Sequence, residues 1–184
     1  GYGNALNVMR TVREFEDAGL AGLSIEDQTF PKRCGHYDGI ALIPATDMAV
    51  KVRAACEARR EADFVIMART DARSVEGLDA AIERACRYAE AGADMIFVES
   101  LADEDEMRKV VAQVPRPLKI NMLEGGKTPR PPFAHLFSLG FRLVNYSGLL
   151  QRAAMRAMEV ALDVLRRDGV TAGLYPDRIV NLAE

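Results

Sequence analysis

The chain has 184 residues, of which 49% are hydrophobic and 28% are charged. These proportions fit one well-filled core and exclude both a membrane protein and a disordered chain. The formal net charge is -3, and the basic residues form no concentrated stretch, so the charge pattern favours neither a nucleic-acid nor a membrane partner. We therefore expect a small-molecule partner.

Along the chain, amphipathic helices alternate with short apolar runs. The predicted helices cover residues 5–15, 46–60, 78–88, 107–114, 133–139 and 149–167. The predicted strands cover residues 20–25, 64–68, 95–98, 118–122 and 141–146. The last helix carries a stripe of small residues from Ala153 to Ala161, and the segment after Gly169 has no clear period. Helix and strand in regular alternation indicate βα architecture.

One spacing recurs along the chain: a glycine is followed, seven residues later, by a polar side chain that ends a strand. The pairs are Gly19 with Glu26, Gly92 with Glu99, and Gly140 with Ser147. A glycine that ends a helix in a left-handed conformation explains the first member of each pair. The spacing predicts one helix–glycine–strand unit used repeatedly.

Buried strands that each follow a helix form either an open doubly wound sheet or a (β/α)₈ barrel. The five predicted strands end at Glu26, Arg69, Glu99, Asn121 and Ser147, side chains that are able to do chemistry. Barrel enzymes build their sites at this end of the strands, and no glycine-rich phosphate turn follows a strand here. We therefore favour an α/β fold of the (β/α)₈ TIM-barrel type, forming a single catalytic domain over residues 1–184.

A complete barrel of this type needs about 250 residues and eight strands. The sequence begins at Gly1 rather than at a methionine, and five strands are predicted. We therefore expect that roughly the first three strands of the barrel are missing from this chain and precede Gly1.

The segment from Lys32 to His36 sets two cations, a thiol and an imidazole in a loop directly after a strand. Positive charge near a thiol favours the thiolate, so Cys34 is a candidate proton donor or acceptor. The alternative is an ordinary solvated basic loop. Zinc is a poor interpretation, because Cys34 and His36 supply two ligands where a zinc site takes three or four.

The remaining candidates are charged strand ends. Glu26 and Asp27 offer carboxylate oxygens, which Mg²⁺ prefers, although two adjacent acids are also typical of a solvated turn. Arg69 suits a substrate carboxylate through its bidentate fork, or alternatively a salt bridge to Asp71. The segment 121–129 is rich in donors and glycine, as a ligand-covering loop would be, and it lacks the glycine spacing of a nucleotide P-loop.

The three cysteines of the chain cannot all pair. Cys56 and Cys86 fall in predicted helices, where a free cysteine usually acts as a small buried apolar residue. A reducing, cytoplasmic location is the expectation.

Taken together, these segments resemble the isocitrate lyase and phosphoenolpyruvate mutase superfamily, in order and over nearly the whole chain. The segments that carry the resemblance are Gly1-Tyr2-Gly3, Ile25-Glu26-Asp27-Gln28, Lys32-Arg33-Cys34-Gly35-His36 and Ala68-Arg69-Thr70-Asp71. The first is similar to the end of the third-strand motif of the family, and the third to its lyase signature loop. The resemblance implies that metal-binding aspartates lie upstream of Gly1, so we expect the polypeptide by itself to be inactive.

The resemblance also implies roles for individual residues. Glu26 would help to hold Mg²⁺, for which Mn²⁺ is a possible substitute. The catalytic residues would be Lys32, Cys34, His36, Arg69 and Glu99, with Cys34 as the acid–base residue. The substrate, a small carboxylic acid, would contact Gly35, Arg69, Glu99 and Asn121. The implied reaction is a retro-aldol (Claisen-type) cleavage of a 2-hydroxy acid into a 2-keto acid and a second carboxylic acid.

Within the superfamily the Cys34 loop argues for a lyase, and the lack of a large insertion points to the short branch that acts on 2-methylisocitrate or 2,3-dimethylmalate. The segment 123–126 leaves broader 2-alkylmalate substrates open. A phosphonomutase, an oxaloacetate decarboxylase or hydrolase, and a non-catalytic binding or assembly barrel are the alternatives. The resemblance further implies a homotetramer that exchanges the C-terminal helix. The stripe from Ala153 to Ala161 is compatible with that exchange and equally with packing of the helix on its own barrel.

Overall fold

The structure is a computed structural model that describes residues 3–174 and 177–180. The predicted end of a third-strand motif at residues 1–3 therefore lies mostly outside the described residues. The chain forms two compact units, Gly1–Asn145 and Tyr146–Glu184. Among the described helices, none is long and apolar enough to cross a membrane.

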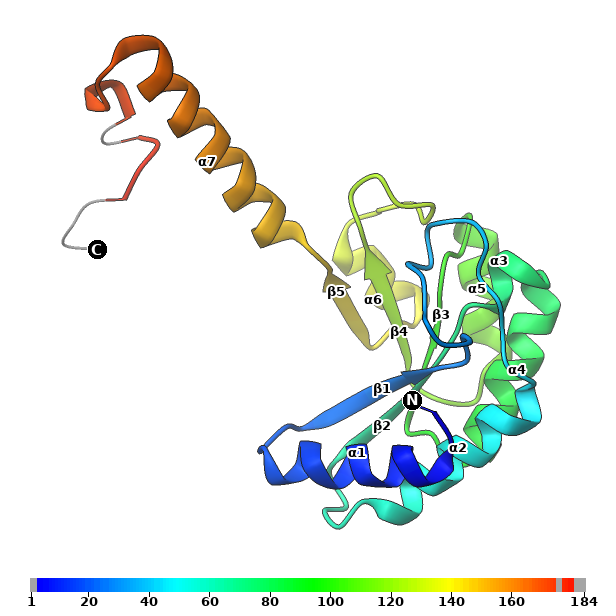
Figure 1. Ribbon diagram of the computed structural model, residues 1–184. Coiled ribbons are helices and arrows are strands. Elements are labelled where there is room, and N and C mark those ends of the chain that lie inside the picture. The colour runs from blue at the N-terminus through cyan, green and yellow to red at the C-terminus, as the bar shows by residue number, and fades with distance from the viewer. Residues whose placement is uncertain (1–2, 175–176, 181–184) are drawn as a thin grey trace. The chain divides into compact units, whose positions relative to one another are not determined.

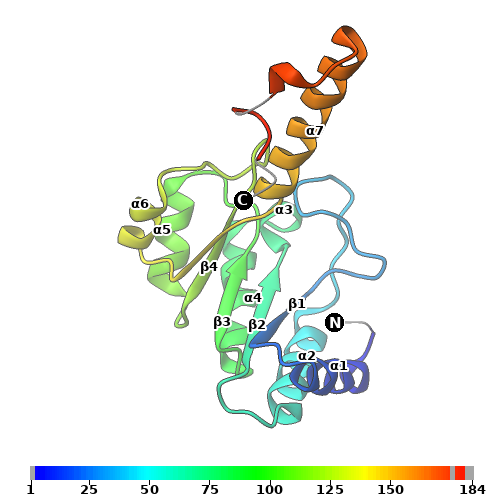
Figure 2. The ribbon, with the colours of Figure 1, turned by 90° about the vertical axis from the view of Figure 1, so that its left-hand side faces the viewer.

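Five strands form one sheet in the chain order β1-β2-β3-β4-β5, and Figure 2 shows β1 to β4. They are β1 (Gly22–Glu26), β2 (Val65–Thr70), β3 (Met95–Val98), β4 (Leu118–Met122) and β5 (Leu143–Tyr146). The pairings of β1 with β2, β2 with β3 and β3 with β4 are parallel. A doubly wound sheet would reverse its strand order at a switch point, whereas a barrel keeps chain order. The fold is a curled parallel half-barrel, which confirms the predicted partial barrel.

The helices lie close to where the hydrophobic periods predict them (Figure 1). They are α1 (Ala5–Asp17), α2 (Ala45–Ala58), α3 (Ala72–Val75), α4 (Leu78–Glu90), α5 (Glu104–Gln113), α6 (Phe133–Leu139) and α7 (Leu149–Asp168), followed by the 3₁₀ turn Ala172–Leu174. Helix α5 begins earlier than predicted, because the Asp103 side chain caps it by accepting a hydrogen bond from the backbone N–H of Glu106. The predicted 141–146 strand begins at Leu143 instead, and Phe141 is buried in the core.

The repeated glycines have the backbone conformation that the spacing predicts. The φ angles of Gly19, Gly92 and Gly140 are 76°, 110° and 120°. A Cβ atom at Gly140 would also lie 2.5 Å from Val111 Cγ1, so this position requires glycine for two reasons.

The core lies between the outer face of the sheet and the helices that cover it. Alternate strand residues enter it, among them Ile66, Ala68, Ile96, Val98, Ile120 and Met122. The intervening residues of β2, β3 and β4, including Arg69, Phe97 and Lys119, face the inner side of the half-barrel. In the second unit, α7 has no buried residues.

Candidate active site

Arg69, at the end of β2, is the centre of an ionic cluster on the inner face. Its Nε and Nη2 donate hydrogen bonds of 2.9 and 2.7 Å to Asp71, its Nη2 lies 3.1 Å from Glu99 Oε2, and its Nε lies 3.3 Å from Glu26 Oε2. The register explains the meeting, since Glu26 is paired with Arg69 across β1 and β2, and Arg69 with Phe97 across β2 and β3. Glu99 follows Phe97 by two residues and so extends from the same face.

These contacts determine the charge of the Arg69 guanidinium and which of its edges is available to a ligand. Burial alone would lower the pKa of Arg69, but the hydrogen-bonded Asp71 and the nearby Glu99 and Glu26 raise it overall, so the guanidinium stays charged. The Nε–Nη2 edge is occupied by Asp71, which is the salt bridge that the sequence offered as the alternative reading. The edge of Arg69 that is left for an anion is therefore the remaining one rather than this one.

The Lys32–His36 loop is held over the strand ends by backbone contacts. Its base is closed by an antiparallel bridge between Gln28 and Leu42. The Gln28 side chain donates to the carbonyl of Arg33 at 3.0 Å and accepts from the N–H of Arg33 at 2.8 Å. Sequence reasoning gave Gln28 no role, although it lies two residues beyond the acid that ends β1. Lys32 Nζ lies 3.3 Å from Glu26 Oε2, so the loop reaches the ionic cluster.

Gly35 lies directly against the ionic cluster. A Cβ atom at this position would lie 2.5 Å from Glu99 Cγ, 2.7 Å from Arg69 Nη2 and 2.7 Å from Asp71 Oδ1. The carbonyl of Gly35 accepts a 3.0 Å hydrogen bond from Ser100 Oγ. The tight packing means that the loop approaches the cluster this closely because residue 35 has no side chain.

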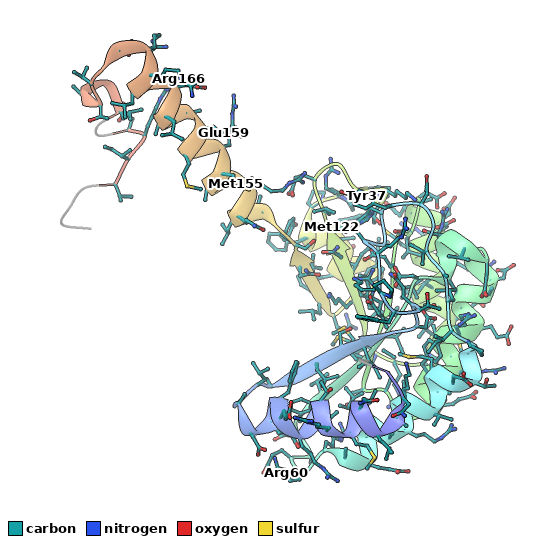
Figure 3. All side chains as sticks on the ribbon, viewed as in Figure 1. Tyr37, Arg60, Met122, Met155, Glu159 and Arg166 are labelled. Atoms are coloured by element: carbon teal, nitrogen blue, oxygen red, sulfur yellow. The ribbon has the colours of Figure 1, made fainter. Side chains whose placement is uncertain are left out.

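Cys34 precedes Gly35 and therefore lies at the same end of the strands as Glu26 and Glu99. Its thiol is free and exposed, and its carbonyl accepts a 2.9 Å hydrogen bond from the N–H of Tyr37. Figure 3 shows Tyr37 and Met122, the last residue of β4, at one end of the barrel unit and Arg60, before β2, at the other. The predicted loop and the predicted strand ends are thus brought together.

His36 joins this loop to the loop after β4. Its side chain is 8% exposed, and its Nδ1 accepts a 3.2 Å hydrogen bond from the N–H of Lys127. The hydrogen of the neutral imidazole is therefore assigned to Nε2. Nε2 lies 3.8 Å from Glu99 Oε1 and has no hydrogen-bond partner in the part of the chain that the structure describes. Gly126 allows the contact, since a Cβ there would lie 3.0 Å from His36 Cε1.

Glu99 and Asn121 are both buried at the strand ends. Glu99 is 3% exposed and accepts a 3.0 Å hydrogen bond from the N–H of Ser100, whose φ of 63° is unusual for a residue other than glycine. The Asn121 Oδ1 atom is buried without a hydrogen-bond partner among the described residues. Buried polar atoms are normally paired, so this amide is suited to a ligand. Ser147, the remaining predicted strand end, lies in the second unit.

A cavity of about 590 Å³ adjoins the cluster. On the inner side it is lined by Glu26, Gln28, Lys32, Arg69, Phe97 and Lys119. Thr11 and Phe15 of α1 and the outward-facing Leu23 and Ile25 of β1 line its other part. Cys34, His36, Glu99 and Asn121 are not among its lining residues. Lys119 lies within the apolar run 118–122, and sequence reasoning assigned it no function.

Asp27 has a structural role, which differs from the cation site that two adjacent acids suggested. It is fully buried and accepts hydrogen bonds from Thr70 Oγ1 at 2.7 Å, Tyr88 Oη at 2.7 Å and the N–H of Asp71 at 3.0 Å. Burial raises the pKa of Asp27, and these donors and the charge of Arg84 oppose the rise. Asp27 thereby connects the end of β1 to the backbone N–H of Asp71, the residue whose side chain accepts the hydrogen bonds of Arg69.

The carboxylates of this site supply only part of what a magnesium ion needs. Glu26 supplies one partly exposed carboxylate on the cavity wall, and Mg²⁺ is commonly held by one or two carboxylates together with water. Across residues 3–174 and 177–180, no group of three or more His, Cys, Asp or Glu side chains could hold a metal. Glu26 is thus suited to a single ligand and does not make a complete site.

Comparison with known proteins is consistent with this architecture. The family model described as phosphoenolpyruvate phosphomutase matches residues 1–165. The chain is 45% identical over 184 residues to a 2,3-dimethylmalate lyase of Eubacterium barkeri, covering 100% of this chain and 63% of the relative. It is 47% identical over 169 residues to a 2-methylisocitrate lyase of Aeropyrum pernix, covering 92% and 54%. The chain therefore spans less than two thirds of the length of these relatives.

Comparison with solved structures leads to the same family. A crystal structure of 2,3-dimethylmalate lyase matches with a TM-score of 0.89 at 34% identity, covering 94% of this chain and 58% of that one. A phosphonopyruvate hydrolase complexed with oxalate and Mg²⁺ matches with a TM-score of 0.85 at 31% identity, covering 100% and 64%. The partial parallel barrel places the chain in the class of (β/α)₈ TIM-type barrel proteins. Within that class, the chain belongs to the phosphoenolpyruvate mutase and isocitrate lyase superfamily.

Proposed function

We propose that the intact protein is a Mg²⁺-dependent carbon–carbon lyase. It cleaves a 2-hydroxy di- or tricarboxylic acid of the 2-alkylmalate or 2-methylisocitrate type into a 2-keto acid, such as pyruvate, and a carboxylic acid. The observation that carries the proposal is the Cys34 loop, which Gly35 packs against the Arg69–Asp71–Glu99 cluster at the strand ends. The relatives named above as lyases support the same reaction class.

The metal would be held on this chain by Glu26, directly or through bound water, with Mn²⁺ as a possible substitute. When bound, a divalent cation stabilises negative charge on the keto-acid oxygen as the bond breaks. Lys32 Nζ and Arg69 Nε each lie 3.3 Å from the same oxygen of Glu26, Oε2, and orient the carboxylate.

The reaction breaks the bond between the carbinol carbon and the carbon next to the departing carboxylate. A base takes the hydroxyl proton, the electron pair of the O–H bond forms the keto group, and the electrons of the broken carbon–carbon bond move onto the departing half as an enolate dianion. Arg69 and Lys32 stabilise the negative charge on the two halves. The Cys34 thiol donates the proton that converts the enolate carbon into a C–H bond. Asn121 and the Nε2–H of His36 supply hydrogen bonds to the substrate oxygens.

The exposure of Cys34 suits a loop that admits substrate and then closes over it. The loop is joined to the segment after β4 by His36 and by an ion pair of 3.4 Å between Lys127 and Asp38. Closure of both segments together would exclude water from the enolate. None of the three cysteines forms a disulfide, which supports a reducing, cytoplasmic location.

A hydrolase or phosphonomutase reaction on a related keto acid is the second candidate, favoured by the likeness to the phosphonopyruvate hydrolase. The test is a substrate panel for the intact protein with Mg²⁺, in which keto-acid release is measured from 2,3-dimethylmalate, other 2-alkylmalates, 2-methylisocitrate, oxaloacetate and phosphonopyruvate. The proposal predicts turnover of a 2-alkylmalate or of 2-methylisocitrate. Turnover of oxaloacetate or phosphonopyruvate alone would replace it with the second candidate, and no turnover would favour a binding or assembly barrel.

We also propose that α7 packs against other subunits in a homotetramer by exchange. Met155, Met158, Leu162 and Leu165 form one helical face and are 51%, 58%, 62% and 45% exposed. Light scattering of the intact protein should give four chains per particle, and Leu162→Glu should reduce this number. Arg167→Gln, on another face of α7, is the control. A monomeric wild-type protein would refute the proposal.

A further inference from the structure

Lys119 of β4 lies beside the ionic cluster at one level of the inner face. The register pairs Arg69 with Phe97 and Phe97 with Lys119, so the three side chains extend from neighbouring strands at the same height. Lys119 Nζ lies 4.4 Å from the centroid of the Phe97 ring, and Arg69 Cζ lies 5.1 Å from it. Two cations thus approach one ring on the wall of the cavity.

Three cations on this cavity wall, Arg69, Lys32 and Lys119, differ in the carboxylates that they contact. Arg69 is surrounded by Asp71, Glu99 and Glu26, and Lys32 is paired with Glu26. Lys119 has no ion pair within the described ranges; its contact is the face of Phe97. Burial lowers the pKa of Lys119, and the charge of Arg69 lowers it further, against a smaller opposite effect of Glu99.

A cation–π contact to Phe97 stabilises the ammonium through the ring face, but it leaves the three hydrogen-bond donors of the ammonium unused. Interior positions of such barrels are usually filled by bulky apolar residues. A partly buried lysine without a carboxylate partner, beside an arginine and on a cavity wall, is suited to an anionic group that enters the cavity.

We propose that Lys119 binds the carboxylate on the departing half of the substrate and thereby selects substrates that carry one there. This inference rests on the proposed lyase function. Lys119 precedes Asn121 by two residues, so it lies about 7 Å below Asn121 along β4, level with Arg69. A substrate whose carbon faces Cys34 at the rim would direct its departing carboxylate inward, towards Lys119.

The same position makes Lys119 a contributor to the rate. As the bond breaks, the departing carboxylate gains the electron pair and becomes a dianion, so its attraction to a fixed ammonium increases in the transition state. Lys119→Met should therefore lower kcat for 2,3-dimethylmalate as well as raise KM, and Lys119→Arg should restore part of the loss. Lys109→Met, which removes an exposed lysine paired with Asp79, is the matched control and should leave both constants unchanged.

A binding experiment separates this inference from the lyase proposal. In a Cys34→Ser background of the intact protein, calorimetry measures the affinity for 2,3-dimethylmalate and for pyruvate, which lacks the departing half. Adding Lys119→Met should weaken 2,3-dimethylmalate binding about 10- to 100-fold, the effect of losing one hydrogen bond to a charged group, and leave pyruvate binding unchanged. Equal losses for both ligands, or no loss for either, would overturn the inference. Absence of wild-type cleavage would refute the lyase proposal and leave this comparison of affinities intact.

Discussion

Replacing Gly35 with alanine tests how closely the Cys34 loop must approach the cluster. The added Cβ would lie 2.5 Å from Glu99 Cγ and 2.7 Å from Arg69 Nη2, where ordinary contact begins at 3.4 Å. Glu99 is 3% exposed and held by Arg69 and the N–H of Ser100, so the loop has to move rather than the cluster. The shift required is roughly 1 Å, and a misplacement of about this size costs about 100-fold in rate.

The assay for Gly35→Ala is kcat/KM for 2,3-dimethylmalate together with urea unfolding of the same preparation. We expect a loss of about 100-fold in kcat/KM, and a loss of about 1 kcal/mol in unfolding free energy, the low end of overpacking costs, because an exposed loop can shift. Gly173→Ala is the control, since its added Cβ would have no atom within 4 Å other than those of its chain neighbours and of the backbone of its own helical turn. Wild-type kcat/KM in Gly35→Ala would refute the reasoning.

Three further predictions follow from individual contacts. Glu26→Gln should raise the Mg²⁺ concentration for half-maximal activity about 10- to 100-fold in chelator-treated protein titrated with MgCl₂, and an unchanged value would remove Glu26 from the metal site. Tyr88→Phe removes a 2.7 Å hydrogen bond to the buried Asp27, so urea unfolding should show a loss of about 1–3 kcal/mol, and no loss would contradict the network described for Asp27. Burial would raise the pKa of Glu106, but hydrogen bonds from Arg73 and from the N–H of Ala102 lower it overall. The stability that Glu106 contributes is therefore present above its ordinary pKa and lost as the pH falls through the lowered value, so Glu106→Gln should be less stable at pH 7 and lose less stability on acidification. An unchanged pH profile of unfolding would count against this assignment.

The repeated spacing between a glycine and a polar residue allowed the fold to be predicted from the sequence. Each glycine ends a helix, and the polar side chain seven residues later ends or closely follows a strand, which locates Glu26 and Glu99. Arg69 follows the apolar run between them, so the position of all three at one rim could be predicted from the parallel order. Their contacts confirm that prediction. Helix α3 was missed, because four residues are too few to show a helical period.

What the sequence left open depends on register and on side-chain direction. Adjacent strand residues alternate between faces, so Glu26 reaches the cavity while Asp27 enters a buried network with Tyr88. In the sequence, Lys119 lies within an apolar run and gives no sign of its direction. Its pairing with Phe97 in the structure shows that it faces the inner side. Side-chain direction at a strand end is set by tertiary pairing, which neither periodicity nor composition encodes.

The most direct test of the account is the proton-donor role of Cys34. In the intact protein with Mg²⁺, Cys34→Ser should abolish cleavage of the substrate identified by the panel, while the affinities for Mg²⁺ and pyruvate stay at their wild-type values. Continued cleavage at the wild-type rate would mean that the enolate takes its proton from another group, and the role given to the loop would be wrong.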